Sequence, residues 1–108
     1  MVTPEALAEL RPLCSEPELN MEAGQTFVSL PGLKIPVGGT LLERHALLTL
    51  QEHSGYTSRL FLSEPIPGHG TGWTIHTVLG RAWHTPSWNN VMPGRPIEML
   101  LSHLRAYR

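Results

Sequence analysis

The clearest periodic pattern of hydrophobic positions lies at the C-terminal end of the chain. Ile97, Leu100, Leu101 and Leu104 repeat at positions i, i+3, i+4 and i+7, and Pro96 stands where a first helical turn accepts proline. This spacing places the four apolar side chains on one face of a helix. We therefore predict a C-terminal helix that buries this face in the core.

A second helix is predicted at the N-terminus. Thr3 can cap it, Pro4 suits the first helical position, and Glu5 complements the positive end of the helix dipole. The predicted helix runs from about Pro4 to Arg11, because Pro12 cannot continue it.

Between the two helices, short runs with β-branched and aromatic residues are separated by Gly, Pro and Ser, which is typical of β-strands. The segment Pro31–Gly39 carries two prolines and a double glycine, so we expect a long turn or an irregular edge there. His53–Tyr56 is short enough for an antiparallel hairpin. The four predicted strands are Thr26–Leu30, His45–Gln51, Ser58–Leu62 and Trp73–Leu79. The sequence thus predicts an α+β fold, a four-stranded antiparallel meander with an N-terminal and a C-terminal helix.

The length of 108 residues suits one domain. We divide residues 1–108 into an N-terminal helix and linker (1–24), the meander (25–79), and a Trp-rich loop with the C-terminal helix (80–108). Residues 63–72 contain too many Pro and Gly for a regular element, so we expect an ordered surface loop there.

Composition and charge narrow the functional classes. The net charge is −1 and the basic residues are spread along the chain, which argues against nucleic-acid binding. No stretch is apolar enough for a membrane span, and the N-terminus lacks the pattern of a secretory signal. The single cysteine, Cys14, fits a reducing compartment. We therefore expect a cytoplasmic protein that binds neither membrane nor nucleic acid.

The order of the predicted elements resembles the ubiquitin-conjugating (UBC) fold. After its meander, that family commonly carries His-Pro-Asn, then Gly-x-(Ile/Val)-Cys, then a Trp and a Pro that introduce the next helix. The corresponding stretches here are His76-Thr77-Val78, Gly80-Arg81-Ala82-Trp83, Trp88, Pro93 and Ile97-Glu98-Met99-Leu100-Leu101. On this alignment Trp83 stands in place of the catalytic cysteine.

The chain is more similar to small bacterial members of this superfamily, of the prokaryotic family E type. These are encoded beside ubiquitin-like proteins, adenylating enzymes and JAB-type metallopeptidases. The similar stretches are Leu33 to Gly38, Gly55-Tyr56 with Phe61-Leu62 and Pro65, Pro93-Gly94 after Trp83, and the closing helix from Ile97 to Leu104. The likeness spans roughly residues 25–108.

What the resemblance implies depends on the missing cysteine. A conjugating enzyme needs a thiolate to receive the carboxyl terminus of a ubiquitin-like protein, and Pro and Asn are also absent after His76. The resemblance therefore implies a non-catalytic domain, without a cofactor, that binds a ubiquitin-like protein or its adenylating (activating) enzyme. A JAB-type metallopeptidase is a further candidate partner. The candidate partner-binding residues are Trp83, His84, Trp88 and Pro67.

An enzymatic alternative would use another nucleophile. Cys14 could accept the thioester if the N-terminal segment folded over the expected site, although its neighbours Leu13 and Ser15 offer nothing that lowers a thiol pKa. Ser87 could form an oxyester with His84 as its base. The competing interpretations are an inert thiol near a helix end and a serine that forms a turn beside proline.

The remaining chemistry-bearing residues are tryptophans and histidines. Trp73, Trp83 and Trp88 are interpreted as core or loop-packing residues unless one is exposed as a binding anchor. The six histidines are His45, His53, His69, His76, His84 and His103, and their spacing contains no metal motif, so no metal site is predicted. A third alternative is an unrelated α+β interaction subunit. Topology distinguishes it, because parallel strand pairing would count against the family.

Overall fold

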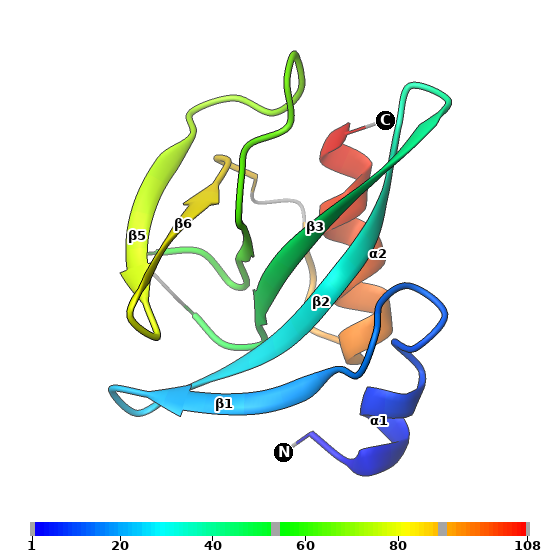
Figure 1. Cartoon of the computed structure of the whole chain (residues 1–108). Coiled ribbons are helices and arrows are strands. Elements are labelled where there is room, and N and C mark those ends of the chain that lie inside the picture. Colours follow the sequence, from blue (N-terminus) through cyan, green and yellow to red (C-terminus); the bar gives the residue numbers. More distant parts are fainter. Residues whose placement is uncertain (1, 53–54, 89–90, 108) are drawn as a thin grey trace.

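The computed structural model describes residues 2–52, 55–88 and 91–107 of the chain (Figure 1). The elements in order are α1 (Pro4–Ala8), β1 (Glu18–Glu22), β2 (Gln25–Val37), β3 (Thr40–Thr49), β4 (Leu60–Leu62), β5 (Thr74–Val78), β6 (Arg81–Thr85), α2 (Pro96–Leu104) and a 3₁₀ turn, η1 (Arg105–Tyr107). The predicted α+β class is confirmed, with one helix at each end of the chain. His53 and Ser54, which belong to the predicted hairpin connection, lie outside the described residues.

The strands form one sheet in the order β1-β2-β3-β4-β6-β5, and every pairing in the described residues is antiparallel. The prediction of an antiparallel sheet is confirmed, but the prediction of four strands is wrong because the sheet has six. Strand β1 occupies the predicted linker, and strand β6 occupies the predicted Trp-rich loop. Four strands follow one another as a meander, and the β5–β6 hairpin extends the sheet beyond β4.

A two-residue turn connects β5 to β6 and brings β6 into the sheet as the second strand of a hairpin. Val78 pairs with Arg81, and the two residues between them, Leu79 and Gly80, have φ angles of 51° and 76°. Positive φ at both central positions defines the turn whose twist matches a β-hairpin, and glycine adopts it without steric cost. Gly80 therefore ends one strand and begins the next.

The segment Pro31–Gly39, expected to interrupt the sheet, lies mostly inside it. Strand β2 continues to Val37, and residues 38–39 form the turn into β3. The register shifts between Leu30 and Leu33, so the two prolines are accommodated by a bulge and a strand end. The predicted long turn is therefore wrong, because a bulge absorbs the irregular backbone without ending the ladder. The alternative prediction of an irregular edge is confirmed, since residues 33–37 of β2 pair with β3 and not with β1.

The N-terminal linker binds to the bulge of β2. Ser15 N donates to Pro31 O at 2.8 Å, and Lys34 N donates to Leu13 O at 2.8 Å. These backbone hydrogen bonds fix Cys14, which lies between the two linker residues. The linker is thus an ordered part of the fold.

The central strands are buried on both faces. On the face covered by α2, the buried side chains include Val28, Leu48, Leu60 and Leu62 from the sheet and Leu100 from the helix. On the second face a smaller cluster contains Phe27, Leu47, Phe61, Val78 and Trp83. Neighbouring residues of a strand point to opposite faces, so double-sided burial explains the continuous apolar runs 46–48 and 60–62.

The helices differ in detail from their predicted forms. Thr3 caps α1, since its side chain accepts from Ala6 N at 3.1 Å, but α1 ends at Ala8 and the chain continues in turns. Helix α2 begins at Pro96 as predicted. Its buried residues are Met99, Leu100, His103 and Leu104, whereas Leu101 is 43% exposed. The predicted apolar face is therefore wrong at Leu101, because a buried histidine takes that place in the core.

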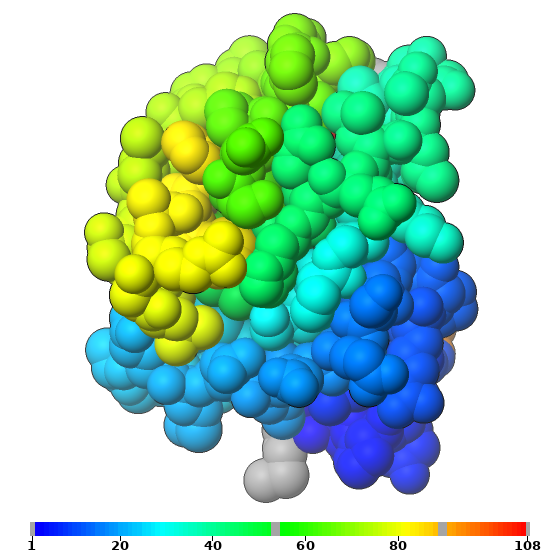
Figure 2. Space-filling model, viewed as in Figure 1, coloured from blue at the N-terminus to red at the C-terminus, as the bar shows by residue number. Residues whose placement is uncertain are grey.

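The sheet curls so that its two hairpin turns meet, as Figure 1 shows where the turn between β5 and β6 lies beside the turn between β1 and β2. Leu79 N donates to the Glu22 carboxylate at 2.8 Å across this junction. Figure 2 shows the second face, where β5 and β6 (yellow-green to yellow) lie next to the green strands. No helix in the described ranges is long and apolar enough to cross a membrane.

Candidate functional site

The residue aligned with the missing cysteine is part of the core. Trp83 lies in β6, is 2% exposed, and donates its indole N–H to Val78 O at 2.9 Å. The ring of His45 meets it edge to face, with 5.2 Å between centroids. The core interpretation is confirmed for Trp83. In this position it presents almost no surface to a partner.

Cys14 lies on the opposite side of the sheet from Trp83. It is 7% exposed in the cluster beneath the helices, and its thiol lies 3.5 Å from Leu10 O. Burial raises the pKa of the Cys14 thiol, which disfavours the reactive thiolate. The structure therefore does not bring Cys14 to the expected site.

Ser87 is exposed, but its hydroxyl is used by the backbone. It donates to Gly72 O at 3.2 Å, and Ser87 N donates to Thr71 O at 2.8 Å. No hydrogen bond joins Ser87 to His84 in the part of the chain that the structure describes. Both bonds hold the loop 71–72 against the end of β6, a structural role that fits the turn interpretation.

The other candidate partner-binding residues lie in different places. Trp88 is half-buried and donates its indole N–H to Ser102 O at 3.0 Å, so it fastens the segment after β6 onto α2. Pro67 is exposed. The neighbouring Ile66 is 2% exposed, and this buried side chain anchors the loop in the core. His84 is half-buried in β6, paired with Leu62 and Ile75. The three residues therefore lie on three different segments: the segment after β6, the loop before β5, and β6 itself.

A Ser–His pair that the sequence did not reveal lies in the core. Ser58 Oγ is 2.8 Å from His103 Nε2, and the two residues are 2% and 4% exposed. The Ser58 hydroxyl donates to Thr49 O, so His103 Nε2 carries the proton that the hydroxyl oxygen accepts. Burial, and then the charge of Arg59, lower the pKa of His103 to about 4. Because His103 Nε2 carries a proton, it cannot act as a base toward the Ser58 hydroxyl, so this pair is structural.

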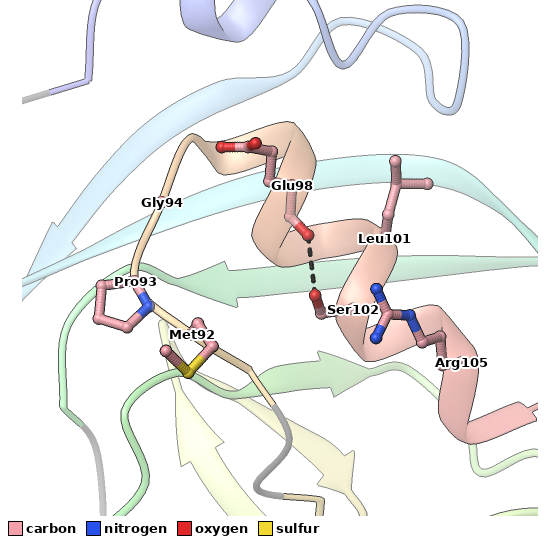
Figure 3. Close-up of a pocket in the computed structure, with 7 residues that line it drawn as sticks. All are labelled: Met92, Pro93, Gly94, Glu98, Leu101, Ser102 and Arg105. Atoms are coloured by element: carbon pink, nitrogen blue, oxygen red, sulfur yellow. Dashed lines mark hydrogen bonds between the residues drawn. The ribbon is translucent and has the colours of Figure 1, made fainter.

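The surface feature most suited to binding lies where α2 begins. A hollow of about 370 Å³ is lined by Met92, Pro93, Gly94, Glu98, Leu101, Ser102 and Arg105. Figure 3 shows Met92 facing the flank of α2 from which Ser102 projects. A groove of about 680 Å³ is lined by Val2, Ala6, Leu19, Met21, Thr26, Leu50, Gln51, Gly94 and Pro96. The two hollows share Gly94, and we call their combined lining the Gly94 surface.

Exposed apolar side chains concentrate on the Gly94 surface. Met92 is 80% exposed, Met21 71%, Leu101 43% and Leu19 42%, which are four of the exposed large hydrophobic residues in the described chain. The remaining two, Leu41 and Ile75, lie elsewhere on the sheet. Grouped apolar exposure with a polar rim marks interaction surfaces. Methionine adapts its shape to a partner, which suits such a surface.

Polar groups fix the shape of this surface. Arg95 bridges the two helices, with Nη1 2.9 Å from the Glu9 carboxylate and its backbone N–H donating to Glu98 at 2.9 Å. The latter bond and the Arg95 charge lower the pKa of the Glu98 carboxyl. The Gly94 segment is therefore held by both helices. Sequence reasoning could have found this surface only from Met92, a large apolar residue outside any predicted element.

No family model, curated protein or solved structure matches the chain. Within the described residues no group of His, Cys, Asp or Glu side chains is arranged to hold a metal ion.

Proposed function

We propose that this chain is a non-catalytic, ubiquitin-conjugating-enzyme-like domain that binds a ubiquitin-like protein or its activating enzyme through the Gly94 surface. The observation that carries the binding role is the concentration of exposed Met92, Met21, Leu101 and Leu19 around two adjoining hollows. The partner class rests on the sequence resemblance from residue 25 to the C-terminus.

The placement of the nucleophiles supports a role without thioester chemistry. Trp83 fills the aligned position with a buried indole, and Cys14 lies across the sheet with a raised pKa. A thiol in that environment is a poor nucleophile, since the thiolate is the reactive form. The thioester alternative needs an accessible thiolate, and the buried Cys14 does not provide one. We therefore propose the binding role alone.

The test begins in the native cells. Affinity purification of the chain, followed by mass spectrometry, should recover a ubiquitin-like protein or an adenylating enzyme without a covalent attachment. The recovered partner is then titrated against the purified chain by calorimetry. Met92→Glu and Leu101→Glu should each weaken binding at least tenfold, because each places a charge in an apolar contact. Ile75→Glu is the matched control, since Ile75 is 66% exposed outside the surface.

Two outcomes would contradict the proposal. An ATP-dependent adduct cleaved by thiol and lost in Cys14→Ala, or cleaved by hydroxylamine and lost in Ser87→Ala, would make the chain a conjugating enzyme. Recovery of unrelated proteins alone would remove the partner class and leave an α+β interaction subunit. If Ile75→Glu weakened binding as much as Met92→Glu, the Gly94 surface would not be the contact.

A further inference from the structure

Strand β1 forms one border of the sheet, and its outer edge is unpaired. In the described residues β1 pairs with β2 alone, and no backbone hydrogen bond outside that ladder involves Leu19 or Met21. Figure 1 shows β1 along the lower border of the sheet. Such a border presents backbone donors and acceptors with which a further strand can pair.

The turn of the β1–β2 hairpin fixes which backbone groups of β1 point outward. Residues 23–24, whose φ angles are 52° and 78°, connect Glu22 to its partner Gln25. The residues on either side of such a turn form a hydrogen-bonded pair, and along an antiparallel ladder these pairs alternate with pairs that share no hydrogen bond. Counting back from Glu22, every second residue bonds to β2. The backbone N–H and C=O groups of the residues in between, Leu19 and Met21, therefore point to the outer edge.

The side chains of the same two residues line an apolar groove. Residues two apart in a strand point to the same face, and Leu19 pairs with Val28 of the core cluster beneath α2. On this face Leu19 and Met21 form part of the 680 Å³ groove of the Gly94 surface, and they are 42% and 71% exposed. Backbone partners and an apolar wall are thus supplied by the same residues.

The other border of the sheet offers a comparison. Strand β5 is also an edge strand, and its hairpin closes with the pair Val78–Arg81. By the same alternation its outward backbone groups belong to Ile75 and Thr77, and neither residue lines the Gly94 surface. A free edge alone marks no site. Strand β1 differs because its free edge adjoins an apolar groove.

We propose that the outer edge of β1 and the adjoining groove form a docking site for an extended segment of a partner protein, which adds to the sheet as a further strand. Backbone hydrogen bonds to Leu19 and Met21 hold the segment, and its side chains opposite these residues extend the apolar wall of the groove. A helix in the groove would leave the backbone groups of the edge unused. The inference rests on the proposed function for its use of the Gly94 surface, and it adds the conformation of the segment that binds there.

Charges on β1 select the sequence of this segment. Glu18 and Glu22 are exposed at the two ends of the strand. If a second copy of the chain paired antiparallel along the whole of β1, Glu18 would face Glu22 of that copy twice, and like charges directly opposite are destabilising. A segment with Lys or Arg facing both glutamates would gain two pairs of opposite charge instead. The occupant is therefore another protein, with the pattern basic, apolar, any residue, apolar, basic.

The site is tested by NMR with a capped synthetic peptide of this pattern, Thr-Lys-Val-Thr-Val-Lys-Thr, and the ¹⁵N-labelled chain. The amide protons of Leu19 and Met21 should exchange rapidly with solvent in the free chain and become protected when the peptide binds. The amide of Asn20, which bonds to β2, should be protected in both states. Met21→Glu should weaken binding about tenfold or more, because it places a charge in the apolar wall. Ile75→Glu, on the other edge, is the matched control.

A second peptide tests the charge pattern. Replacing both of its lysines by glutamate should weaken binding to the unchanged chain about fivefold or more, because two opposite-charge pairs become like-charge pairs. Glu18→Lys should remove the preference between the two peptides, since each then meets one opposite and one like charge on β1. Glu22 is left unchanged because its carboxylate also accepts from Leu79 N.

Several results would overturn the site. Absence of peptide binding would remove it, and shifts of the Met21 methyl signal without protection of the Leu19 and Met21 amides would make the groove a site for another conformation. Equal affinity for the two peptides would remove the charge pattern. Sedimentation of the unchanged chain as a dimer that Met21→Glu dissociates would make the occupant a second copy. Dispersed amide spectra establish that each variant folds.

The partner recovered from native cells separates this inference from the proposed function. If a ubiquitin-like partner binds and Met92→Glu weakens it, while the amides of Leu19 and Met21 stay unprotected, the strand inference fails and the proposed function stands. If the peptide protects these amides but no ubiquitin-like protein or activating enzyme is recovered, the docking edge stands and the proposed function fails.

Discussion

Two serine–histidine pairs of nearly the same chemistry differ in the exposure of their histidine, although both serines are buried. Ser58 and His103 are 2.8 Å apart and almost fully buried, whereas Ser29 and His45 are 3.2 Å apart and His45 is half-exposed. In both pairs the histidine Nε2 donates to the serine oxygen, and burial, followed by the charge of an arginine, lowers the pKa of the histidine. Hydrogen-bond geometry alone therefore does not identify a functional histidine. The two pairs are distinguished by the exposure of the histidine and by the exposure of the arginine beside it.

The arginines differ in the same way as the histidines. Arg59 is 5% exposed, stacks on Tyr56 with 4.1 Å between its guanidinium carbon and the ring centroid, and donates to Pro86 O at 3.4 Å. Its Nε has no hydrogen-bond partner among the residues that the structure describes. Arg81 stacks on Trp83 in an exposed position. Arg59 thus joins the segment before β4 to the end of β6, while the exposed Arg81 joins β6 to β3 through His45.

The largest expected effect is acid sensitivity of the buried pair. The pKa of His103 is about 4 in the folded chain, below the ordinary value of about 6.5. The unfolded chain therefore binds more protons between these values, so stability is complete above pH 6.5 and falls as the pH drops toward 4. The expected loss is about 3 kcal/mol of unfolding free energy.

Chemical denaturation at pH 7 and pH 4.5 measures this loss. His103→Gln removes the titrating group, so it should show a smaller loss than the unchanged chain. Carboxylates titrate in both proteins, and the difference between the two losses isolates His103. Identical losses would show that His103 is not kept neutral by its burial.

Removal of the buried hydroxyl should have the next largest effect. Ser58→Ala leaves His103 Nε2–H without its acceptor in the core, at a cost of about 1 to 3 kcal/mol. Ser29→Ala is the matched change in the second pair. Ser29 is 9% exposed, but its partner His45 is half-exposed and can turn its ring N–H toward water, so this change should cost less than Ser58→Ala. Urea denaturation compares them, and equal costs would remove the distinction between the two pairs.

The smallest effect concerns the exposed pair. Burial and then the charge of Arg81 lower the pKa of His45. Arg81→Gln removes the charge, so the pKa of His45 should rise toward its ordinary value while that of His103 stays unchanged. NMR titration of the ring protons measures both. A pKa of His45 that does not respond would mean that Arg81 lies away from the ring in solution.

Some of the fold followed from local patterns. The start of α2 at Pro96 and the cap at Thr3 were predictable because each depends on residues within one helical turn. The antiparallel pairing was predictable from short connections. Strand β6 could also have been predicted from the sequence, because only Leu79 and Gly80 separate two segments of alternating polarity. The resemblance instead predicts a loop there, because it aligns this segment with the cysteine-bearing segment of the family.

The candidate surfaces were less predictable. Trp83 and Trp88 were sensible binding candidates by residue type, but both indole N–H groups are used inside the molecule. Met92 and Arg81 carry no motif. Their significance depends on what surrounds them after folding, and no local spacing records it.

The sequence by itself determined the class of the fold, its helix starts and the absence of a cysteine from the segment around Trp83, because these depend on neighbouring residues or on composition. Only the tertiary structure decided which histidine is buried and which arginine lies beside each histidine. Ser58 and His103 are 45 positions apart, and His45 and Arg81 are 36 apart. Contacts over such separations are made by the packing of the whole chain, which also sets the burial that governs each pKa.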